Sequence, residues 1–444
     1  MPIWPWGRQT RHGRLISERS PIPPMRLCWS LNYRISPKAE SASRDGSGTG
    51  ITFIERHDNM MRRTLFLILL SAVVLPGCSM FKNMFKDEEV EGPAELVSFK
   101  PEVSIRRQWS VNVGSGQGDK YNTLMPAIDG GMIYAAGSNG VVVAVDRESG
   151  RTRWRKRLKL PVTGGVGVGS GLVLVGSENS QVVALEQDSG DERWRAGVSS
   201  EVLSAPKTNG RIVVVQTVDG KLIGLNVETG AQVWIYESTV PALSLRGTSS
   251  PLIVDDFVLS AHANGTVVSV AADNGTLRWE QRVSLPTGRS EIDRMVDIDG
   301  ELYLDDGAVL VSGYHGYLVA IDVVTGQKRW QVKESSYNGG SAGFGNFYMC
   351  DEKGHVKAYR AGQDEAVWVN DKLDLRPLSA PISFGNYVAV GDFEGYVHVL
   401  SQVDGRFVGR TRVERSGVRA NMLARGDTLY VFGNGGRLVA LQVR

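Results

Sequence analysis

The stretch Arg211–Trp234 reads RIVVVQTVDGKLIGLNVETGAQVW and contains two apolar runs, two glycine turns and a short final strand that ends in tryptophan. Glycine accepts the positive φ that tight hairpins require, so this order of features predicts an antiparallel meander. The same order recurs along the chain, and the closing tryptophan is found at Trp154, Trp194, Trp279, Trp330 and Trp368. The sequence is therefore that of a repeat protein.

Successive tryptophans are about 40 residues apart, which fits four short strands per repeat and a β-propeller. No segment has the sustained 3.6-residue periodicity of a helical solenoid. One late repeat carries Val408 where tryptophan is expected, and the last repeat stops before any tryptophan-bearing strand. The missing strand lies at the other end, where Trp109 precedes the first complete repeat. We therefore predict an all-β, eight-bladed propeller over residues 105–444, with four antiparallel strands per blade, closed by the N-terminal strand completing the C-terminal blade.

Each repeat places a small residue and an acidic residue ahead of a glycine turn and the tryptophan, as in Ala144-Val-Asp146 before Trp154. This pattern resembles the PQQ-like repeat. The small residue allows neighbouring strands to approach closely, and tryptophan supplies a large apolar plate between adjacent blades. We therefore expect the repeated tryptophans to be core residues.

The segment before the repeats has the layout of an export signal. In residues 61–77, two arginines precede an apolar run that is too short to span a membrane comfortably, and Cys78 follows. This arrangement resembles the bacterial lipoprotein signal, which implies that Cys78 is acylated and anchors the protein in the outer membrane, facing the periplasm. The alternative is a transmembrane anchor with a cytoplasmic head.

An export signal acts at an N-terminus, so we interpret residues 1–60 as lying upstream of the true start codon, at Met60 or Met61. Residues 78–104 are charged and poorly patterned, which predicts a flexible, lipidated tether. From Cys78 onward the chain has 39 Lys and Arg against 43 Asp and Glu, so nothing indicates a nucleic-acid surface.

The repeats show no pattern of a catalytic, cofactor or metal site. The three cysteines form no CxxC pair, and no P-loop, GxSxG or HExxH motif occurs. The nearest match to a calcium loop, Met295–Gly300, has methionine in place of the first carboxylate ligand. The sequence therefore argues against an enzyme, although a quinone-dependent dehydrogenase stays open as an alternative because such enzymes share the repeat.

Among complete repeats the two longest tryptophan spacings, 45 and 51 residues, are consecutive, with extra residues after Trp234 and after Trp279. Insertions in a repeat array map to loops on one face, which is often the binding face. We therefore expect these two segments, each of which joins one blade to the next, to lie side by side and form one patch.

The two long segments carry the residue types that interfaces use. Leu243 and Leu245 are candidate apolar anchors, Arg246 is a planar donor, and Asp297 and Asp299 are candidate acceptors. The alternative is that the leucines belong to the core and that Arg246 pairs inside the molecule with an aspartate of the next loop.

An acylated cysteine, eight PQQ-like blades and the strings LSLRG and TGRSEIDRMVDID together resemble the propeller lipoproteins of the outer-membrane β-barrel assembly machinery. The resemblance implies a non-catalytic scaffold that assists delivery, folding and insertion of outer-membrane proteins. It also implies that Leu243, Leu245, Arg246, Asp297 and Asp299 contact the machinery's central barrel subunit through its periplasmic POTRA domains. A further possibility is direct binding of extended, unfolded outer-membrane proteins at strand edges or in the channel.

Overall fold

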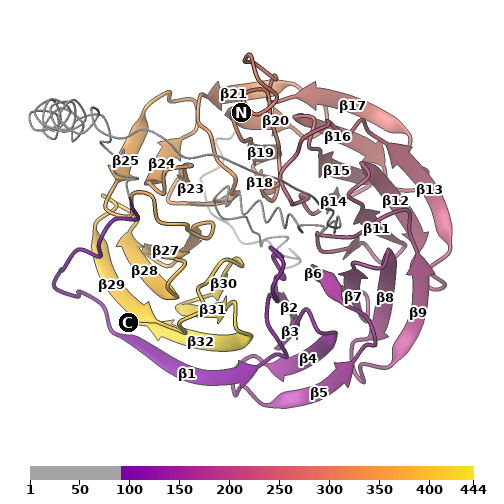
Figure 1. Ribbon diagram of the computed structural model, residues 1–444, viewed down its shortest axis with the longest axis horizontal. Helices are drawn as coiled ribbons and strands as arrows, with labels where there is room; N and C mark the ends of the chain where they lie inside the picture. Colours follow the sequence, from indigo (N-terminus) through magenta and orange to yellow (C-terminus); the bar gives the residue numbers. More distant parts are fainter. Residues whose placement is uncertain (1–91) are drawn as a thin grey trace, which may run out of the picture. The chain divides into compact units, whose positions relative to one another are not determined.

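Eight four-stranded antiparallel sheets are arranged as the blades of a ring in a computed structural model, which describes residues 92–444 (Figure 1). The first blade consists of β2 (Ala127–Asp129), β3 (Met132–Ala136), β4 (Val141–Asp146) and β5 (Thr152–Arg157). The short strand β2 lies nearest the ring axis and β5 lies at the rim (Figure 1). The prediction of an eight-bladed propeller is confirmed.

The next six blades repeat this order of strands, from the innermost strand to the rim. They are β6 (Val162–Gly169), β7 (Leu172–Ser177), β8 (Gln181–Glu186) and β9 (Glu192–Gly197); β10 (Lys207–Thr208), β11 (Ile212–Gln216), β12 (Lys221–Asn226) and β13 (Gln232–Glu237); β14 (Leu252–Val254), β15 (Phe257–Ala261), β16 (Thr266–Ala271) and β17 (Leu277–Arg282); β18 (Tyr303–Asp305), β19 (Ala308–Ser312), β20 (Leu318–Asp322) and β21 (Lys328–Val332); β22 (Gly340–Gly343), β23 (Asn346–Cys350), β24 (Val356–Arg360) and β25 (Ala366–Asn370); and β26 (Ile382–Phe384), β27 (Tyr387–Gly391), β28 (Tyr396–Ser401) and β29 (Phe407–Arg412).

The eighth blade joins the two ends of the ordered chain. It contains β30 (Leu423–Arg425), β31 (Thr428–Phe432) and β32 (Arg437–Val443), and its rim strand is β1 (Ile105–Asn112). β1 pairs antiparallel with β32, from Ile105 opposite Val443 to Asn112 opposite Arg437. The N-terminal strand therefore completes the C-terminal blade, as the sequence predicts.

The rim tryptophans seal one blade to the next. Trp154 lies opposite Ala144 in its own sheet and donates from Nε1 to the carbonyl of Gln187 in the following blade, at 3.0 Å. A Cβ atom on Gly190 would lie 2.7 Å from the Trp154 ring, so the turn glycine leaves room for the indole. The same indole-to-carbonyl bond occurs at Trp109, Trp194, Trp234, Trp279 and Trp368. The tryptophans pack in the seams between blades; Trp154, Trp194, Trp234 and Trp368 are buried core residues as predicted, whereas Trp109, Trp279 and Trp330 are half-buried.

Gly409, rather than Val408, occupies the tryptophan position in the seventh blade. Trp234 lies opposite Gly224 and Trp368 opposite Ala358, and by the same pairing Gly409 is the residue opposite Val399. Counting 40 residues from Trp368 therefore places the position one residue too early. In most of the other blades the indole packs against the turn between the third strand and the rim strand of the next blade. The eighth blade has no such turn, because its third strand, β32, and its rim strand, β1, are the two ends of the ordered chain. Val103 and Ile105 pass over Gly409 instead.

Residues 94–104 form an ordered strap along the edge of β29. The amides of Glu102 and Val103 both donate to the carbonyl of Val408, at 2.8 and 3.2 Å. At the other end of the strap, the amide of Ala94 donates to the carbonyl of Asp374 at 2.9 Å. The sequence pattern predicts a flexible tether as far as residue 104. The strap is ordered because the edge of β29 supplies the hydrogen bonds that the segment's own composition does not.

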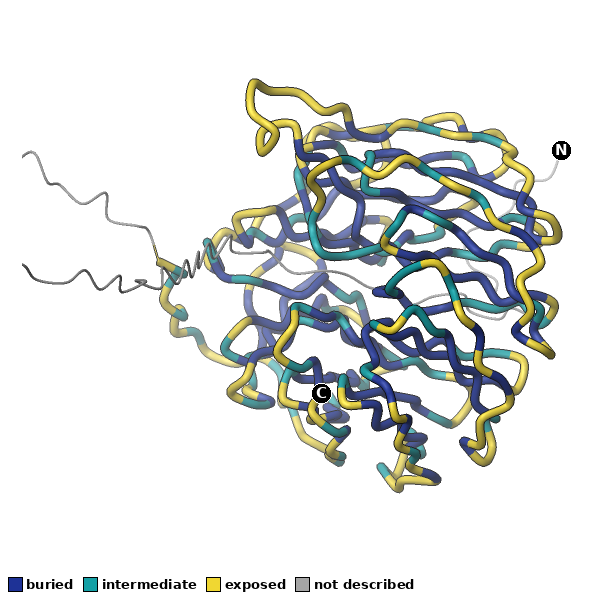
Figure 2. The backbone as a smooth tube through the Cα atoms, turned by 45° about the vertical axis from the view of Figure 1, so that its right-hand side comes forward, coloured by how far each residue is buried: buried dark blue, intermediate teal, exposed yellow. Residues whose placement is uncertain are grey.

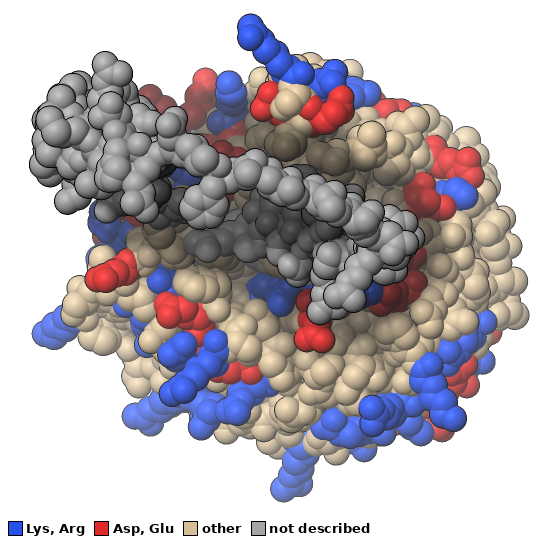
Figure 3. All heavy atoms as spheres, viewed as in Figure 1, with Lys and Arg blue, Asp and Glu red and all other residues tan. Residues whose placement is uncertain are grey.

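The strands are largely buried, and the exposed residues gather in turns, connections and rim strands (Figure 2). Many Lys and Arg side chains lie on the rim along β1, β5 and β9, whereas few charged side chains lie on the rim at β13 (Figure 3). The connections that lead from each rim strand to the next inner strand all lie on one face of the ring, because every blade has the same strand order. Within residues 92–444 the structure contains no helix long and apolar enough to cross a membrane.

Candidate docking surface

Two neighbouring connections carry the insertions after Trp234 and Trp279; the connection from β1 to β2, residues 113–126, is as long as the first of them. The first long connection, residues 238–251, joins β13 to β14, and the second, residues 283–302, joins β17 to β18. They touch each other, since the amide of Leu245 donates to the Asp297 carboxylate at 2.8 Å. The two extra segments are therefore in contact with each other, as predicted.

The two connections expose several apolar side chains. Leu243 is 44% exposed, so it is not a core residue, and Leu245 is half-buried. Apolar side chains that sequence reasoning missed are also exposed here, with Leu285 at 62% and Ile292 at 45%. We define the docking patch as Val240, Leu243, Leu285 and Ile292. The signal for the missed members was an apolar residue within an otherwise polar inserted segment.

Arg246 is paired inside the molecule, but not with an aspartate. Its guanidinium binds both carboxylate oxygens of Glu201, at 2.8 and 3.1 Å, and its Nη2 lies 3.4 Å from Asn122 Oδ1. Glu201 belongs to the connection between β9 and β10, and Asn122 to the one between β1 and β2. Arg246 is still about one third exposed, so it joins three connections and keeps part of its surface available.

Asp297 lies beneath the first long connection with only 1% of its surface exposed. Its carboxylate accepts the amides of Leu245, at 2.8 Å, and of Ile298, at 2.9 Å. Its own carbonyl accepts the amide of Tyr314 at 2.8 Å, which ties the second long connection to blade 5. Burial raises the pKa of Asp297, and the two amide donors together with a hydrogen bond from Asp299 oppose that rise.

Asp299 is equally inaccessible, at 4% exposure, and its carboxyl group packs against Gly247. A Cβ atom at Gly247 would lie 2.3 Å from Oδ2 of Asp299, so a larger residue would displace the connection. Burial and the neighbouring Asp297 charge raise the pKa of Asp299 well above its ordinary value. Two adjacent buried carboxyl groups resist a double negative charge, so the pair keeps one proton, carried by Asp299, at neutral pH.

The two aspartates are supports of the loop rather than surface groups. Sequence reasoning placed them on the surface as acceptors, because it could not see that the first long connection folds over them. Together they fix the backbone of Leu245 and leave space for Gly247. Docking through these aspartates would therefore act by holding Leu243 and Arg246 in position.

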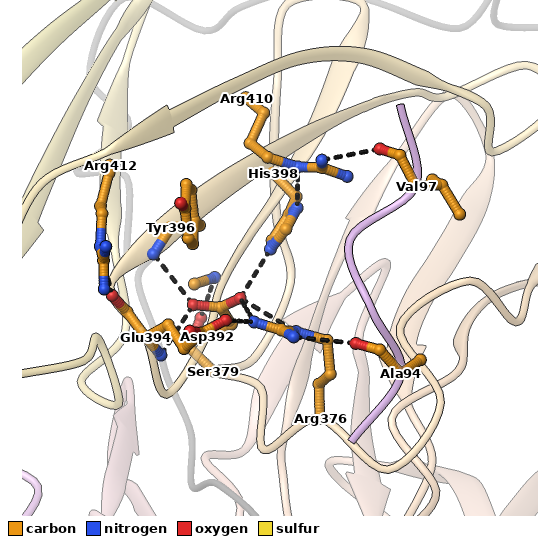
Figure 4. A network of polar contacts seen from close by, with 11 residues as sticks. Ala94, Val97, Arg376, Ser379, Asp392, Glu394, Tyr396, His398, Arg410 and Arg412 are labelled. Atoms are coloured by element: carbon orange, nitrogen blue, oxygen red, sulfur yellow. Dashed lines mark hydrogen bonds and ion pairs between the residues drawn. The ribbon is translucent and has the colours of Figure 1, made fainter. Parts of the chain in front are cut away.

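A second buried carboxylate lies in blade 7, where it holds the strap (Figure 4). Asp392 has no exposed surface and accepts hydrogen bonds from Arg376 Nη2 at 2.6 Å and Arg376 Nε at 3.1 Å. The other Arg376 nitrogen, Nη1, donates to the carbonyl of Ala94 at 2.9 Å. The His398 ring and the Arg376 guanidinium outweigh burial and lower the pKa of Asp392.

His398 extends this network to the middle of the strap. Arg410 Nε donates to His398 Nδ1 at 3.0 Å, and Arg410 Nη1 donates to the carbonyl of Val97 at 2.9 Å. Because a guanidinium has only donors, Nδ1 must accept, and Nε2–H donates to Asp392 at 3.0 Å. Burial and two nearby arginines lower the pKa of His398, so the ring is neutral.

The ring axis contains a cavity of about 570 Å³, lined by the inner strands and the turns that join them. Among residues 92–444, no group of three or more His, Cys, Asp or Glu side chains is placed to hold a metal ion, and this includes the near-match to a calcium loop at Met295–Gly300. Cys78, the candidate acylation site, lies outside the described residues. The geometry therefore directs attention to the docking patch rather than to the channel.

Comparison with known proteins agrees with this architecture. Residues 138–370 match the family described as "Outer membrane protein assembly factor BamB". The protein of that name from Pseudomonas aeruginosa is 57% identical over 377 residues, covering 85% of this chain and 98% of the relative. The one from Escherichia coli is 33% identical over 391 residues, covering 86% of this chain and 99% of the relative.

Solved structures show the same relationship. The crystal structure of BamB from Moraxella catarrhalis superposes with a TM-score of 0.71 at 27% identity, covering 76% of this chain and 100% of that one. The quinohemoprotein alcohol dehydrogenase from Comamonas testosteroni gives a TM-score of 0.61 at 15% identity, which shows a shared fold alone. By the extent and identity of these matches, the chain belongs to the family of the outer membrane protein assembly factor BamB.

Proposed function

We propose that this protein is an outer-membrane protein assembly factor that acts as a non-catalytic scaffold in the β-barrel assembly machinery. Membership of the BamB family supports the assembly role. The observation that carries the mechanism is the docking patch, four exposed apolar side chains on two connections that are joined by the hydrogen bond from the Leu245 amide to the buried Asp297 carboxylate. Apolar anchors on a preorganised surface are typical of protein interfaces, because little conformational entropy is lost on binding.

The proposed partner is the central barrel subunit, BamA, contacted through its periplasmic POTRA domains. Leu243 and the exposed part of Arg246 make the contact, while Leu245, Asp297 and Asp299 keep that surface in shape. An acyl chain on Cys78 anchors the protein to the periplasmic side of the outer membrane. Labelling with radioactive palmitate in the parent and in Cys78→Ser tests the anchor, and equal labelling of both would refute it.

Leu243→Asp tests the docking patch, because it places a charge on an exposed anchor without removing a core contact. We expect co-purification with the barrel subunit to weaken by about 2–4 kcal/mol while the melting temperature stays unchanged. Val324→Asp is a matched control, since Val324 is 68% exposed in a turn between β20 and β21, away from the long connections. Equal co-purification of both variants with the barrel subunit would contradict the docking proposal.

The charge-swapped pair Arg246→Glu with Glu201→Arg separates the internal role of Arg246 from its contact with the partner. The swap restores the pair that holds the first long connection. If Arg246 acts only within the molecule, the double variant regains binding. If it also touches the partner, as proposed, the double variant regains stability and stays defective in docking.

A further inference from the structure

The rim strand β13 differs from most other rim strands in the residues beside its tryptophan. On β5 and β9 the flanking residues are arginines, namely Arg153 and Arg155, and Arg193 and Arg195. On β13 they are Val233, 53% exposed, and Ile235, 40% exposed. Natural edge strands are usually blunted by charged side chains, since their free backbone groups pair with other extended chains. β13 lacks this protection.

The molecule itself shows how such an edge is occupied. In blade 7 the strap lies along β29, and the carbonyl of Val408 accepts two strap amides. Val408 precedes Gly409, the residue opposite Val399, just as Val233 precedes Trp234, the residue opposite Gly224. Val233 is therefore the structural equivalent of Val408, and no segment of the described chain pairs with the rim side of β13.

The backbone of β13 directs further groups away from the blade. The amide of Ser238 donates to the carbonyl of Gly220 in its own blade. Pairing groups alternate along an antiparallel strand, so Tyr236 also faces β12, while Ile235 and Glu237 direct their amides and carbonyls outward. These outward groups and the two exposed apolar side chains form one strip, which runs directly into the first long connection.

We propose that the outer edge of β13 is a pairing site for one extended segment of an unfolded outer-membrane protein. The inference rests on the proposed function, which supplies such clients. Strands of outer-membrane barrels alternate apolar and polar residues, so their apolar side chains can pack on Val233 and Ile235 while their backbone groups bond Ile235 and Glu237. The charged rims of β5 and β9 resist the same pairing.

β25 is the one other tryptophan-bearing rim strand with apolar flanking residues, Val367 and Val369, among those described. It leads into the connection that holds the strap, where Asp374 and Arg376 bind Ala94. β13 leads instead into the docking connections, where a client would be handed to the barrel subunit. We therefore assign the site to β13, and β25 serves as the control edge.

The test uses the full-length purified protein and a fluorescent ten-residue peptide of alternating valine and threonine, followed by fluorescence anisotropy. We expect Ile235→Arg to weaken peptide binding about tenfold or more, because it places on β13 a charged side chain of the kind that disfavours strand pairing at β5 and β9. Val369→Arg on β25 should leave binding unchanged. The same peptide with N-methyl groups on alternate residues should not bind, since pairing needs its amides. Absence of binding to the parent protein, or loss with Val369→Arg in place of Ile235→Arg, would overturn the assignment.

Docking onto the barrel subunit is measured in parallel, so that the two proposals fail separately. We expect Ile235→Arg to retain docking and Leu243→Asp to retain peptide binding. If Leu243→Asp leaves docking intact while the peptide results hold, the docking proposal fails and the β13 site stands. If Ile235→Arg abolishes docking as well, β13 is part of the docking surface and the client site is wrong.

Discussion

Asp392 in blade 7 and the pair Asp297–Asp299 under the first long connection are all nearly inaccessible to solvent, yet their partners differ. Asp392 is paired with Arg376 and His398, and its pKa is lowered. Asp297 and Asp299 have no cationic partner among the described contacts; Asp297 accepts two amide hydrogen bonds, and the pKa values of both carboxyl groups are raised. The comparison shows that burial alone does not determine the charge of a carboxyl group; its donors do.

The two sites also hold different kinds of segment. The ionised site binds the strap through Arg376, and a buried charge pair is costly to break once formed. The proton-sharing site holds the first long connection through one amide bond, so it can open at a smaller cost. We infer that blade 7 is a permanent clamp and that the docking loop is the more adjustable element. Four predictions test this difference.

Arg376→Met should have the largest effect. It leaves Asp392 buried without its guanidinium partner and removes the bond to Ala94, so we expect a loss of about 3–5 kcal/mol in the free energy of unfolding. Urea unfolding followed by tryptophan fluorescence measures this loss. Arg412→Met is the matched control, because Arg412 is exposed, donates to the carbonyl of Glu394, stacks on the Tyr396 ring and has no buried carboxylate partner among the described contacts. Similar losses in both variants would contradict the clamp.

Asp297→Ala should have an intermediate effect. The amide of Leu245 loses its acceptor, and we expect a loss of about 1–3 kcal/mol in unfolding free energy together with faster hydrogen exchange of that amide. Docking to the barrel subunit should weaken in parallel. Asp293→Ala is the control, since Asp293 is exposed and its hydrogen bonds are to Ser290 and Arg289 of its own connection. Unchanged exchange at Leu245 in Asp297→Ala would show that the carboxylate does not hold the loop.

A change of pH should affect the two sites differently. The raised pKa of Asp297, to about 7, means that the folded pair binds more protons than the unfolded chain, so its contribution falls as pH rises from about 4 to about 7. The pKa of Asp392 is lowered, so its contribution is lost only below about 4. Between pH 7.5 and pH 5.5 we expect the Leu245 amide to gain protection on the order of 1 kcal/mol, after correction for intrinsic exchange. The Ala94 amide should not change, and an equal gain there would refute the distinction.

Asp299→Asn should have the smallest effect at pH 7.5, below about 1 kcal/mol, because an amide can donate to Asp297 as the neutral acid does. The pH response of the Leu245 amide should persist, because burial rather than Asp299 is the cause of the raised pKa of Asp297. Asp299→Ala is the comparison variant and should cost more, because it removes the donor. Loss of the pH response in Asp299→Asn would assign the titration to Asp299 instead of Asp297.

The fold could be predicted from the sequence because each repeat carries the residues that pack its blade against the next. The spacing from Trp154 to Trp194, the glycine turns and the displaced strand at Trp109 define the blades and their closure. The error of one residue at Val408 arises because the connections between blades differ in length, so a fixed count of 40 residues from Trp368 does not reach the residue opposite Val399.

The site was only partly readable. The long connections were identified by their length, and Leu243 lies on the surface as a candidate anchor should. The burial of Asp297 and Asp299 depends on the neighbouring connection folding over them, which no local pattern encodes. The partnership of Arg246 with Glu201 joins residues 45 positions apart, and the strap is ordered by contacts to residues about 300 positions away. Such pairings arise only when the ring brings distant connections to the same face.

Closure of the ring by β1 and β32 has a consequence for how the molecule is made. During folding, β1 has no strand partner until β32, the last strand of the chain, is available to pair with it. Pairing of residues 105–112 with residues 437–443 then closes the ring of blades. A protein proposed to bind unpaired strands of other proteins therefore passes through a stage in which its own first strand is unpaired.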